Sequence, residues 1–167
     1  MKNSKQPPSR RYSDRPFPPY RYIPGETPHP EIDPKGHSYG RRPLPVSYLS
    51  PEKWRENAKY LYAVDLYNFH YWWEAHEAWE TVWQTTQKID DYGQFLQGLI
   101  QISAGMLKWH TRQEKGRKSL FKAGVERLRT LPGTTFMGLD LPKHLKKIEQ
   151  FLATLDKSDY PFVELLI

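Results

Sequence analysis

The sequence contains no cysteine and no apolar run of the length that crosses a membrane. Without cysteine the chain can form neither a disulfide nor a thiolate metal site, and it cannot use a cysteine nucleophile. A membrane span needs about 18 apolar residues, and residues 1–21 also lack the apolar segment of a secretory signal. Their acid-poor opening is compatible with a transit peptide, but the prolines that follow interrupt an amphipathic helix. We therefore expect a cytoplasmic protein that does not bind membranes.

Tryptophan is absent from residues 1–50, and proline is scarce in residues 51–167. Eleven of the 15 prolines lie in the first segment, and all six tryptophans lie in the second. The first segment carries nine Lys or Arg against four Asp or Glu, whereas the second carries sixteen against fifteen. We therefore divide the chain into a proline-rich basic leader, residues 1–50, and one all-helical domain, residues 51–167. The domain is long enough to have its own core.

The leader is poor in hydrophobic residues, and composition alone favours disorder or polyproline II. Its prolines nevertheless stiffen the backbone, so docking costs less conformational entropy. Aromatic residues between positions 16 and 40 also supply apolar surface that docking would bury. We expect the leader to be partly docked on the helical domain, over about residues 16–40. The alternative is a solvated tail that binds a partner.

Apolar residues recur at helical spacing throughout the second segment, and no stretch alternates convincingly with a period of two. The expected helices span about 51–68, 71–86, 91–113, 117–130 and 141–157. Asn68 is expected to cap the second helix, Gly116 to break the third, and residues 133–139 to form a loop. The fold class is thus all-α, a single bundle of about five helices with an extended leader. The residues expected to be largely buried are Trp83, Leu96, Ile100, Leu107, Leu120, Val125, Leu128 and Ile148.

Residues 71–83 hold four tryptophans, three glutamates and a histidine. Charged groups beside a buried aromatic wall are tolerated only when they are paired, hydrogen-bonded or metal-bound. At about 100° per residue, His76 and Glu80 lie one above the other on a helix, and Glu77 lies between the two polar faces. His76, Glu77 and Glu80 are therefore the candidate catalytic residues.

A divalent metal is the cofactor that these side chains would take. The candidate ligands are His76, Glu80 and His110, together with His29 and His37 if the leader docks; the supporting residues are Glu74, Gln97 and Gln101. The string 76–80 resembles the zinc-protease helix, but a glutamate replaces the second histidine of that motif, which weakens the signal. It also lacks the paired Glu-x-x-His elements of a di-iron bundle. A purely structural hydrogen-bond network is the alternative.

The stretch 65–83, followed by Phe95–Gln101 and His110, resembles the all-helical domain-of-unknown-function family 309. The resemblance covers about residues 61–131, and its specific part is Glu-Ala-His-Glu followed by Gln-Gly-Leu-Ile-Gln. It implies a small multihelical fold and no established activity. The family commonly has glycine where this chain has His70, so we expect the turn between the first two helices to be built differently. The implied polar cluster consists of Glu74, His76, Glu77, Glu80, Gln97 and His110.

Three classes of function fit these observations. A binding or interaction role ranks first, with surplus aromatic residues contacting a protein partner or a second copy of the chain. The aromatic residues concerned are Trp54, Tyr71, Trp79 and Trp109. A metal-dependent or acid/base hydrolase-like enzyme that uses His76, Glu77 and Glu80 is the alternative. Nucleic-acid binding through the basic leader and the basic run 108–129 ranks last, because no recognised motif frames it and the run would simply complement the acidic second helix.

Overall fold

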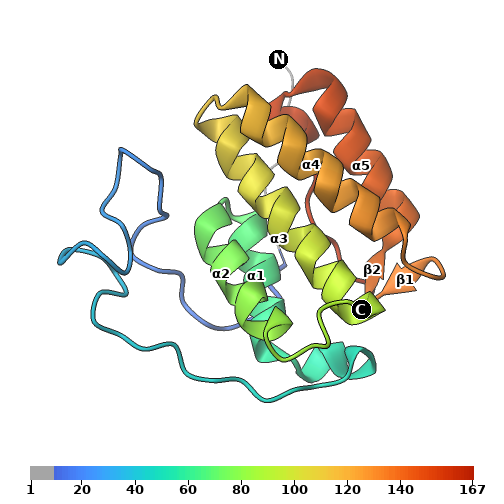
Figure 1. The fold of residues 1–167 in the computed structure, drawn as a ribbon, viewed down its shortest axis with the longest axis horizontal. Helices are drawn as coiled ribbons and strands as arrows, with labels where there is room; N and C mark the ends of the chain where they lie inside the picture. The colour runs from blue at the N-terminus through green and yellow to red at the C-terminus, as the bar shows by residue number, and fades with distance from the viewer. Residues whose placement is uncertain (1–9) are drawn as a thin grey trace.

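The computed structural model describes residues 10–167, and α-helices dominate it (Figure 1). The elements run in the order η1 (Pro51–Glu56), α1 (Ala58–Asn68), α2 (Trp72–Trp83), α3 (Asp91–His110), α4 (Glu114–Arg129), β1 (Thr135–Phe136), β2 (Leu139–Asp140), α5 (Leu141–Thr154) and η2 (Lys157–Asp159), where η marks a 3-10 helix. The two short strands pair antiparallel, with Thr135 opposite Asp140. The all-α prediction is confirmed. Within the described residues, no helix is long and apolar enough to cross a membrane.

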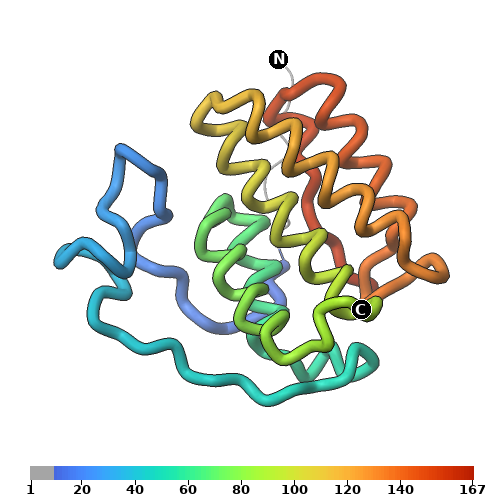
Figure 2. The backbone as a smooth tube through the Cα atoms, viewed as in Figure 1, coloured from blue at the N-terminus to red at the C-terminus, as the bar shows by residue number. Residues whose placement is uncertain are grey.

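Consecutive helices pack against one another, and α3 contacts both α2 and α4. Figure 2 shows α3 between the α1–α2 pair on one side and α4 and α5 on the other. Gly98 of α3 and Gly124 of α4 allow the closest approach, because a Cβ atom at Gly124 would lie 2.9 Å from the carbonyl oxygen of Gly98. The side chains that fill the core between these layers include Trp79, Tyr60, Tyr67, Phe95, Phe121 and Phe151.

Two of the expected helix boundaries are wrong. The segment 51–68 is divided at Asn57, whose side chain accepts a hydrogen bond of 3.0 Å from the backbone N–H of Tyr60 and so caps α1. Gly116 lies inside α4 and does not end the third helix. The break falls instead at Arg112, whose φ of 58° takes the backbone into the left-handed region that ends many helices.

The turn between α1 and α2 uses its polar residues differently from the sequence-based expectation. Asn68 does not cap α2; it exchanges hydrogen bonds of 2.8 and 2.9 Å with the backbone of Val163 near the end of the chain. His70 has a φ of 71°, in the region that favours glycine. Because His70 carries a Cβ atom, this conformation is strained. Its ring packs between Trp72 and Tyr160. The backbone conformation of this turn is therefore one that a glycine would adopt readily.

The expected loop at residues 133–139 contains a hairpin. Met137 and Gly138 both have positive φ, as in the two-residue turns that join antiparallel strands. A Cβ atom on Gly138 would lie 2.5 Å from the ring of Trp54, so glycine is needed for close packing as well as for the turn. Of the expected core, Leu96, Ile100, Val125, Leu128 and Ile148 are buried, whereas Trp83, Leu107 and Leu120 are half-buried.

The described part of the leader, residues 10–50, begins behind the bundle, near α1. It loops out beside α2 and returns to η1 (Figure 1). It has no helix or strand of its own. Ile23 at its turn is only 2% exposed, and Tyr12 and Phe17 pack against the core of the helical domain. The leader thus contributes apolar contacts to the same core as the helices.

Candidate functional site

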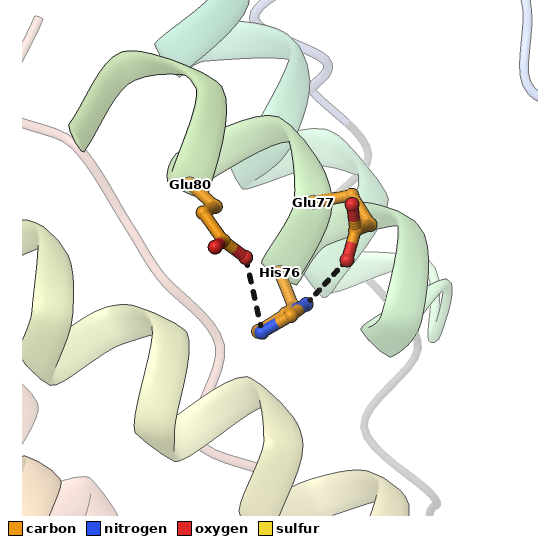
Figure 3. A group of neighbouring side chains, drawn as sticks. All are labelled: His76, Glu77 and Glu80. Carbon is orange, nitrogen blue, oxygen red and sulfur yellow. Dashed lines mark ion pairs between the residues drawn. The ribbon is translucent and has the colours of Figure 1, made fainter. Parts of the chain in front are cut away.

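His76, Glu77 and Glu80 come together on α2, as Figure 3 shows, and we call them the exposed cluster. The Nδ1 atom of His76 lies 3.1 Å from Oε1 of Glu77, and its Nε2 atom lies 3.5 Å from Oε2 of Glu80. One ligand atom from each residue lies within 4.8 Å of the others. The side chains remain 28%, 39% and 41% exposed, so the aromatic enclosure expected around them is absent and water reaches all three.

The other histidines expected as metal ligands have different neighbours. The ring of His110 lies 5.3 Å from that of Trp72, and burial together with the charge of Arg21 lowers the pKa of this histidine. His29 packs edge-on against Trp73, and its Nδ1 atom accepts backbone hydrogen bonds from its own loop. His37 contacts a different carboxylate, described below. Among residues 10–167, the one group of three that could share an ion is the exposed cluster.

Gln101 of α3 does not support the carboxylates of α2. Gln101 accepts a hydrogen bond of 3.1 Å from Nε of Arg127 on α4, so its side chain reaches toward the opposite neighbour, and Gln97 is half-buried. The basic run 108–129 also fails to complement α2. Arg127 binds glutamines of α3, and Arg129 forms a salt bridge of 2.6 Å with Glu149 of α5.

Glu74 is a buried attachment point for the leader. Its side chain is 5% exposed, and Oε1 accepts a 2.7 Å hydrogen bond from the backbone N–H of Tyr22 and lies 3.1 Å from Nε2 of His37. Oε2 is buried without a hydrogen-bond partner among the described residues. Burial raises the pKa of Glu74, although the hydrogen bonds from His37 and Tyr22 oppose the rise. The sequence-based analysis had placed His37 and Glu74 in one polar centre, but not as partners of each other.

Asp65 of α1 is a second attachment point, which the sequence-based analysis missed. It is completely buried, and its two oxygens accept hydrogen bonds of 2.9 Å from the backbone N–H groups of Tyr12 and Ser13. Nε of Arg11 lies 3.3 Å from Oδ2. Burial raises the pKa of Asp65, and these three donors oppose the rise. The sequence feature that could have identified Asp65 is a single acid inside an apolar helical run, since such a group needs hydrogen-bond donors from elsewhere in the chain.

The aromatic residues assigned to a partner surface pack mostly within the chain. Trp54 and Trp79 are buried in the core. Tyr71 stacks on Phe17 of the leader with ring centroids 5.0 Å apart. Trp109 is half-buried and packs edge-on against α5. Trp54 and Trp79 are therefore parts of the core, whereas contact of Tyr71 or Trp109 with a partner stays a prediction.

A cavity of about 470 Å³ lies where the leader meets α1 and α2. We call it the leader cavity. Its wall includes Arg15, Arg41 and Arg42 from the leader, Lys59 and Tyr62 from α1, and Trp73, Glu74 and Glu77 from α2. Glu77 belongs to both this wall and the exposed cluster, so the two features adjoin. A second hollow of about 530 Å³ lies between α4 and α5, on the far side of α3.

Residues 60–120 match a protein family described as Domain of unknown function (DUF309). This segment belongs to the DUF309 family. The resemblance noted in the sequence is confirmed, and the DUF309 segment contains Asp65, Glu74 and the exposed cluster. Searches of the curated proteins and of the solved structures found no match. The family description states no activity, so a function has to be argued from the geometry.

Proposed function

We propose that this chain is a binding protein and that its ligand occupies the leader cavity. The observation that supports the proposal is the construction of the cavity from two parts of the chain. The leader lies over α1 and α2 and is attached at Asp65 and Glu74, and a space of about 470 Å³ is left beside Glu74. Ligand sites of small molecules have volumes of roughly 300–1,000 Å³, so the space is of the usual size.

The wall of the leader cavity combines apolar and polar groups in the way that ligand sites commonly do. Tyr62, Leu66 and Trp73 supply apolar surface, while arginine, lysine and glutamate side chains supply charge. Trp73 also packs against Tyr22 and His29 of the leader, so both parts of the chain hold its ring in place. A wall fixed in this way would lose little entropy on binding, which favours affinity.

Two-dimensional NMR of the full chain with a library of small fragments tests this proposal, because tryptophan indole N–H groups report on separate regions. Fragments that saturate a site should shift the indole signal of Trp73, whereas the indole of Trp109, outside the cavity, should stay unchanged. The matched variants are Trp73→Leu and Trp83→Leu, since both residues are half-buried on α2 and only Trp73 lines the cavity. Binding should weaken in the first variant only. Saturable binding that never involves Trp73 or its neighbours would contradict the proposal.

A second candidate, the metal-dependent enzyme of the sequence-based analysis, is supported by the geometry of the exposed cluster. One nitrogen of His76 and the carboxylate of Glu80 would bind the ion, while Glu77 would orient the ring through the other nitrogen, as carboxylates commonly do for metal-binding histidines. Such a set leaves positions for water and suits Zn²⁺ or a similar divalent ion. With so few protein ligands on an exposed helix, we expect weak binding, and we rank this candidate second.

Zinc titration of protein purified without an affinity tag tests the second candidate. Calorimetry should give one site that His76→Ala removes and that His110→Ala leaves intact, because His110 lies outside the exposed cluster. Equal zinc binding by the wild type and His76→Ala would remove the candidate. Nucleic-acid binding has no comparable observation in its favour within residues 10–167.

A further inference from the structure

We infer that the leader cavity takes a small molecule that carries a phosphate group on a partly apolar body. This inference rests on the proposed function and adds the chemical class of the ligand. It comes from the cations on the cavity wall, from the lack of salt bridges to them among the described residues, and from the apolar surface beside them.

Four cationic side chains line the leader cavity: Arg15, Arg41, Arg42 and Lys59. Among the residues that the structure describes, none of the four forms a salt bridge. Arg15 and the adjacent pair Arg41 and Arg42 come from two places in the leader, and Lys59 comes from α1, so the fold brings together charges from three segments. Cations gathered at a concave surface raise the local potential and attract anions.

The carboxylates of the same wall are mostly occupied. Glu74 is held by His37 and the backbone of Tyr22, and Glu77 contacts the ring of His76. Glu31 is the third carboxylate of the wall, and it lies on the exposed leader. The wall therefore holds four cations and three carboxylates, an excess of one positive charge, and no described salt bridge joins the cations to these carboxylates.

Lys59 and Arg15 are neighbouring cations of this wall. Burial lowers the pKa of the Lys59 ammonium group, and the charge of Arg15 lowers it further. Arg15 itself lies over the ring of Tyr62, with its guanidinium carbon 4.7 Å from the ring centroid, so its planar donor group has a preferred orientation. A bound anion would compensate both cations, since it would supply the opposite charge that the chain does not.

Phosphate fits this wall better than a carboxylate does. The parallel N–H donors of arginine match carboxylate and phosphate alike, but a phosphate monoester carries about −1.5 to −2 charge near neutral pH, which suits a group of four cations better than a single charge does. Inorganic phosphate alone would fill only a part of about 470 Å³. The remaining wall contains Tyr62, Leu66 and Trp73, which suit an apolar or ring-shaped body.

The hollow between α4 and α5 provides an internal comparison. It also has several cations, including Arg117, Lys118, Lys122 and Arg129, but Glu126 and Glu149 lie in the same wall. Two of the cations form salt bridges, Arg129 with Glu149 and Lys118 with Glu114. Half of its cations are thus paired within the chain, whereas none of the four cations of the leader cavity forms a salt bridge among the described residues, so the hollow offers control positions.

Calorimetry and NMR of the tag-free full chain test the inference with defined probes. The probes are inorganic phosphate, adenosine monophosphate with adenosine, and glucose 6-phosphate with glucose. We expect phosphate to shift signals of the leader cavity, and at least one phosphate ester to bind about tenfold or more tightly than its unphosphorylated partner. The double variant Arg42→Gln, Lys59→Gln should weaken that binding at least about tenfold. Lys122→Gln, in the other hollow, should leave it unchanged.

Three results would overturn the inference. They are the absence of any saturable shift with phosphate and both esters, equal binding of the phosphorylated and unphosphorylated probes, and unchanged binding by the double variant with its fold verified by circular dichroism. None of these removes the proposed function, which fails only if fragments that bind never involve Trp73. The two failures can therefore be told apart.

Discussion

Helix α2 takes part in two similar groups of residues in opposite environments. Glu74 is buried beneath the leader and partnered by His37, whereas the exposed cluster, one helical turn further along, is open to water. Both sets contain glutamate beside histidine, so residue type does not distinguish them. The difference arises from what covers each side of the helix. One helix that is rich in glutamate, histidine and tryptophan can therefore bind another segment of the chain on one side, while its residues on the other side stay accessible to ligands.

The energetic demands on the two sets also differ. A buried carboxylate loses its hydration and has to be compensated by donors, as the backbone of the leader compensates Asp65 and Glu74. The exposed cluster keeps much of its hydration, and pairs of this kind contribute about 0–1 kcal/mol each. Stability should thus respond strongly to changes at the leader attachments and weakly to changes in the exposed cluster.

Removal of residues 1–49 should have the largest effect. It would expose the surfaces that Tyr12, Phe17 and Ile23 cover, and it would take the donors away from Asp65. Because burial of one large apolar side chain contributes about 1.5–3 kcal/mol, we expect a loss of at least about 3 kcal/mol in the free energy of unfolding. Urea denaturation measures it. In limited proteolysis the full chain should resist trimming over residues 16–40. Rapid trimming to about Leu49 with an unchanged melting temperature would instead show a free tail.

Asp65→Ala should rank second, with a loss of about 2–4 kcal/mol, because it leaves two backbone N–H groups of the leader without their acceptor. The leader should also become sensitive to protease. Asp65→Asn keeps the size and one acceptor oxygen, so its loss should be smaller. Glu126→Ala on the exposed side of α4 is the control and should change stability by less than about 0.5 kcal/mol. If the Asp65→Ala variant is as stable and as resistant to protease as the wild type, Asp65 does not hold the leader in place.

Glu74→Gln should have a smaller effect that depends on pH. Because the folded protein raises the pKa of Glu74 above 4.5, the protonated side chain favours the folded state. That contribution is complete below pH 4.5 and is lost as the pH rises through the folded-state pKa. The stability of the wild type relative to Glu74→Gln should therefore fall with rising pH, beginning near pH 4.5. Urea denaturation between pH 4 and 7 measures the difference.

Other titrating groups face Glu74 and need a control. His37 comes from the leader, while Tyr62 and Tyr71 belong to α1 and the start of α2. The same comparison in a His37→Gln background removes the histidine that contacts Glu74. If the stability difference between wild type and Glu74→Gln stays constant or rises with pH in both backgrounds, the assignment of the pKa shift to burial is wrong.

His76→Ala should have the smallest effect on stability, below about 1 kcal/mol, because it removes two partly exposed pairs from one helix. Protease resistance of the leader should not change. His37→Ala is the comparison, since it removes a buried partner of Glu74 and should destabilise the protein more. If His76→Ala proves the more destabilising of the two, the contrast between the exposed cluster and the leader attachments fails.

The sequence by itself determined the features that depend on neighbouring residues. Apolar spacing fixed the number and approximate positions of the main helices, because a helix presents every third or fourth residue to the same side. The same local geometry brought His76, Glu77 and Glu80 together, since residues one turn apart on a helix are neighbours. The DUF309 segment was recognised for a similar reason, as its motifs are continuous in the chain.

Only the tertiary structure decided which polar groups are buried and which partners they have. Asp65 and Glu74 accept hydrogen bonds from leader backbone N–H groups more than 50 residues earlier in the chain, and no periodicity relates such positions. For the same reason His29, His37 and His110 do not join the exposed cluster, and the four cations of the leader cavity come from three segments of the chain. Helix periodicity acts over a few residues, whereas the path of a proline-rich leader is set by the surface on which it packs and by the donors that buried carboxylates require.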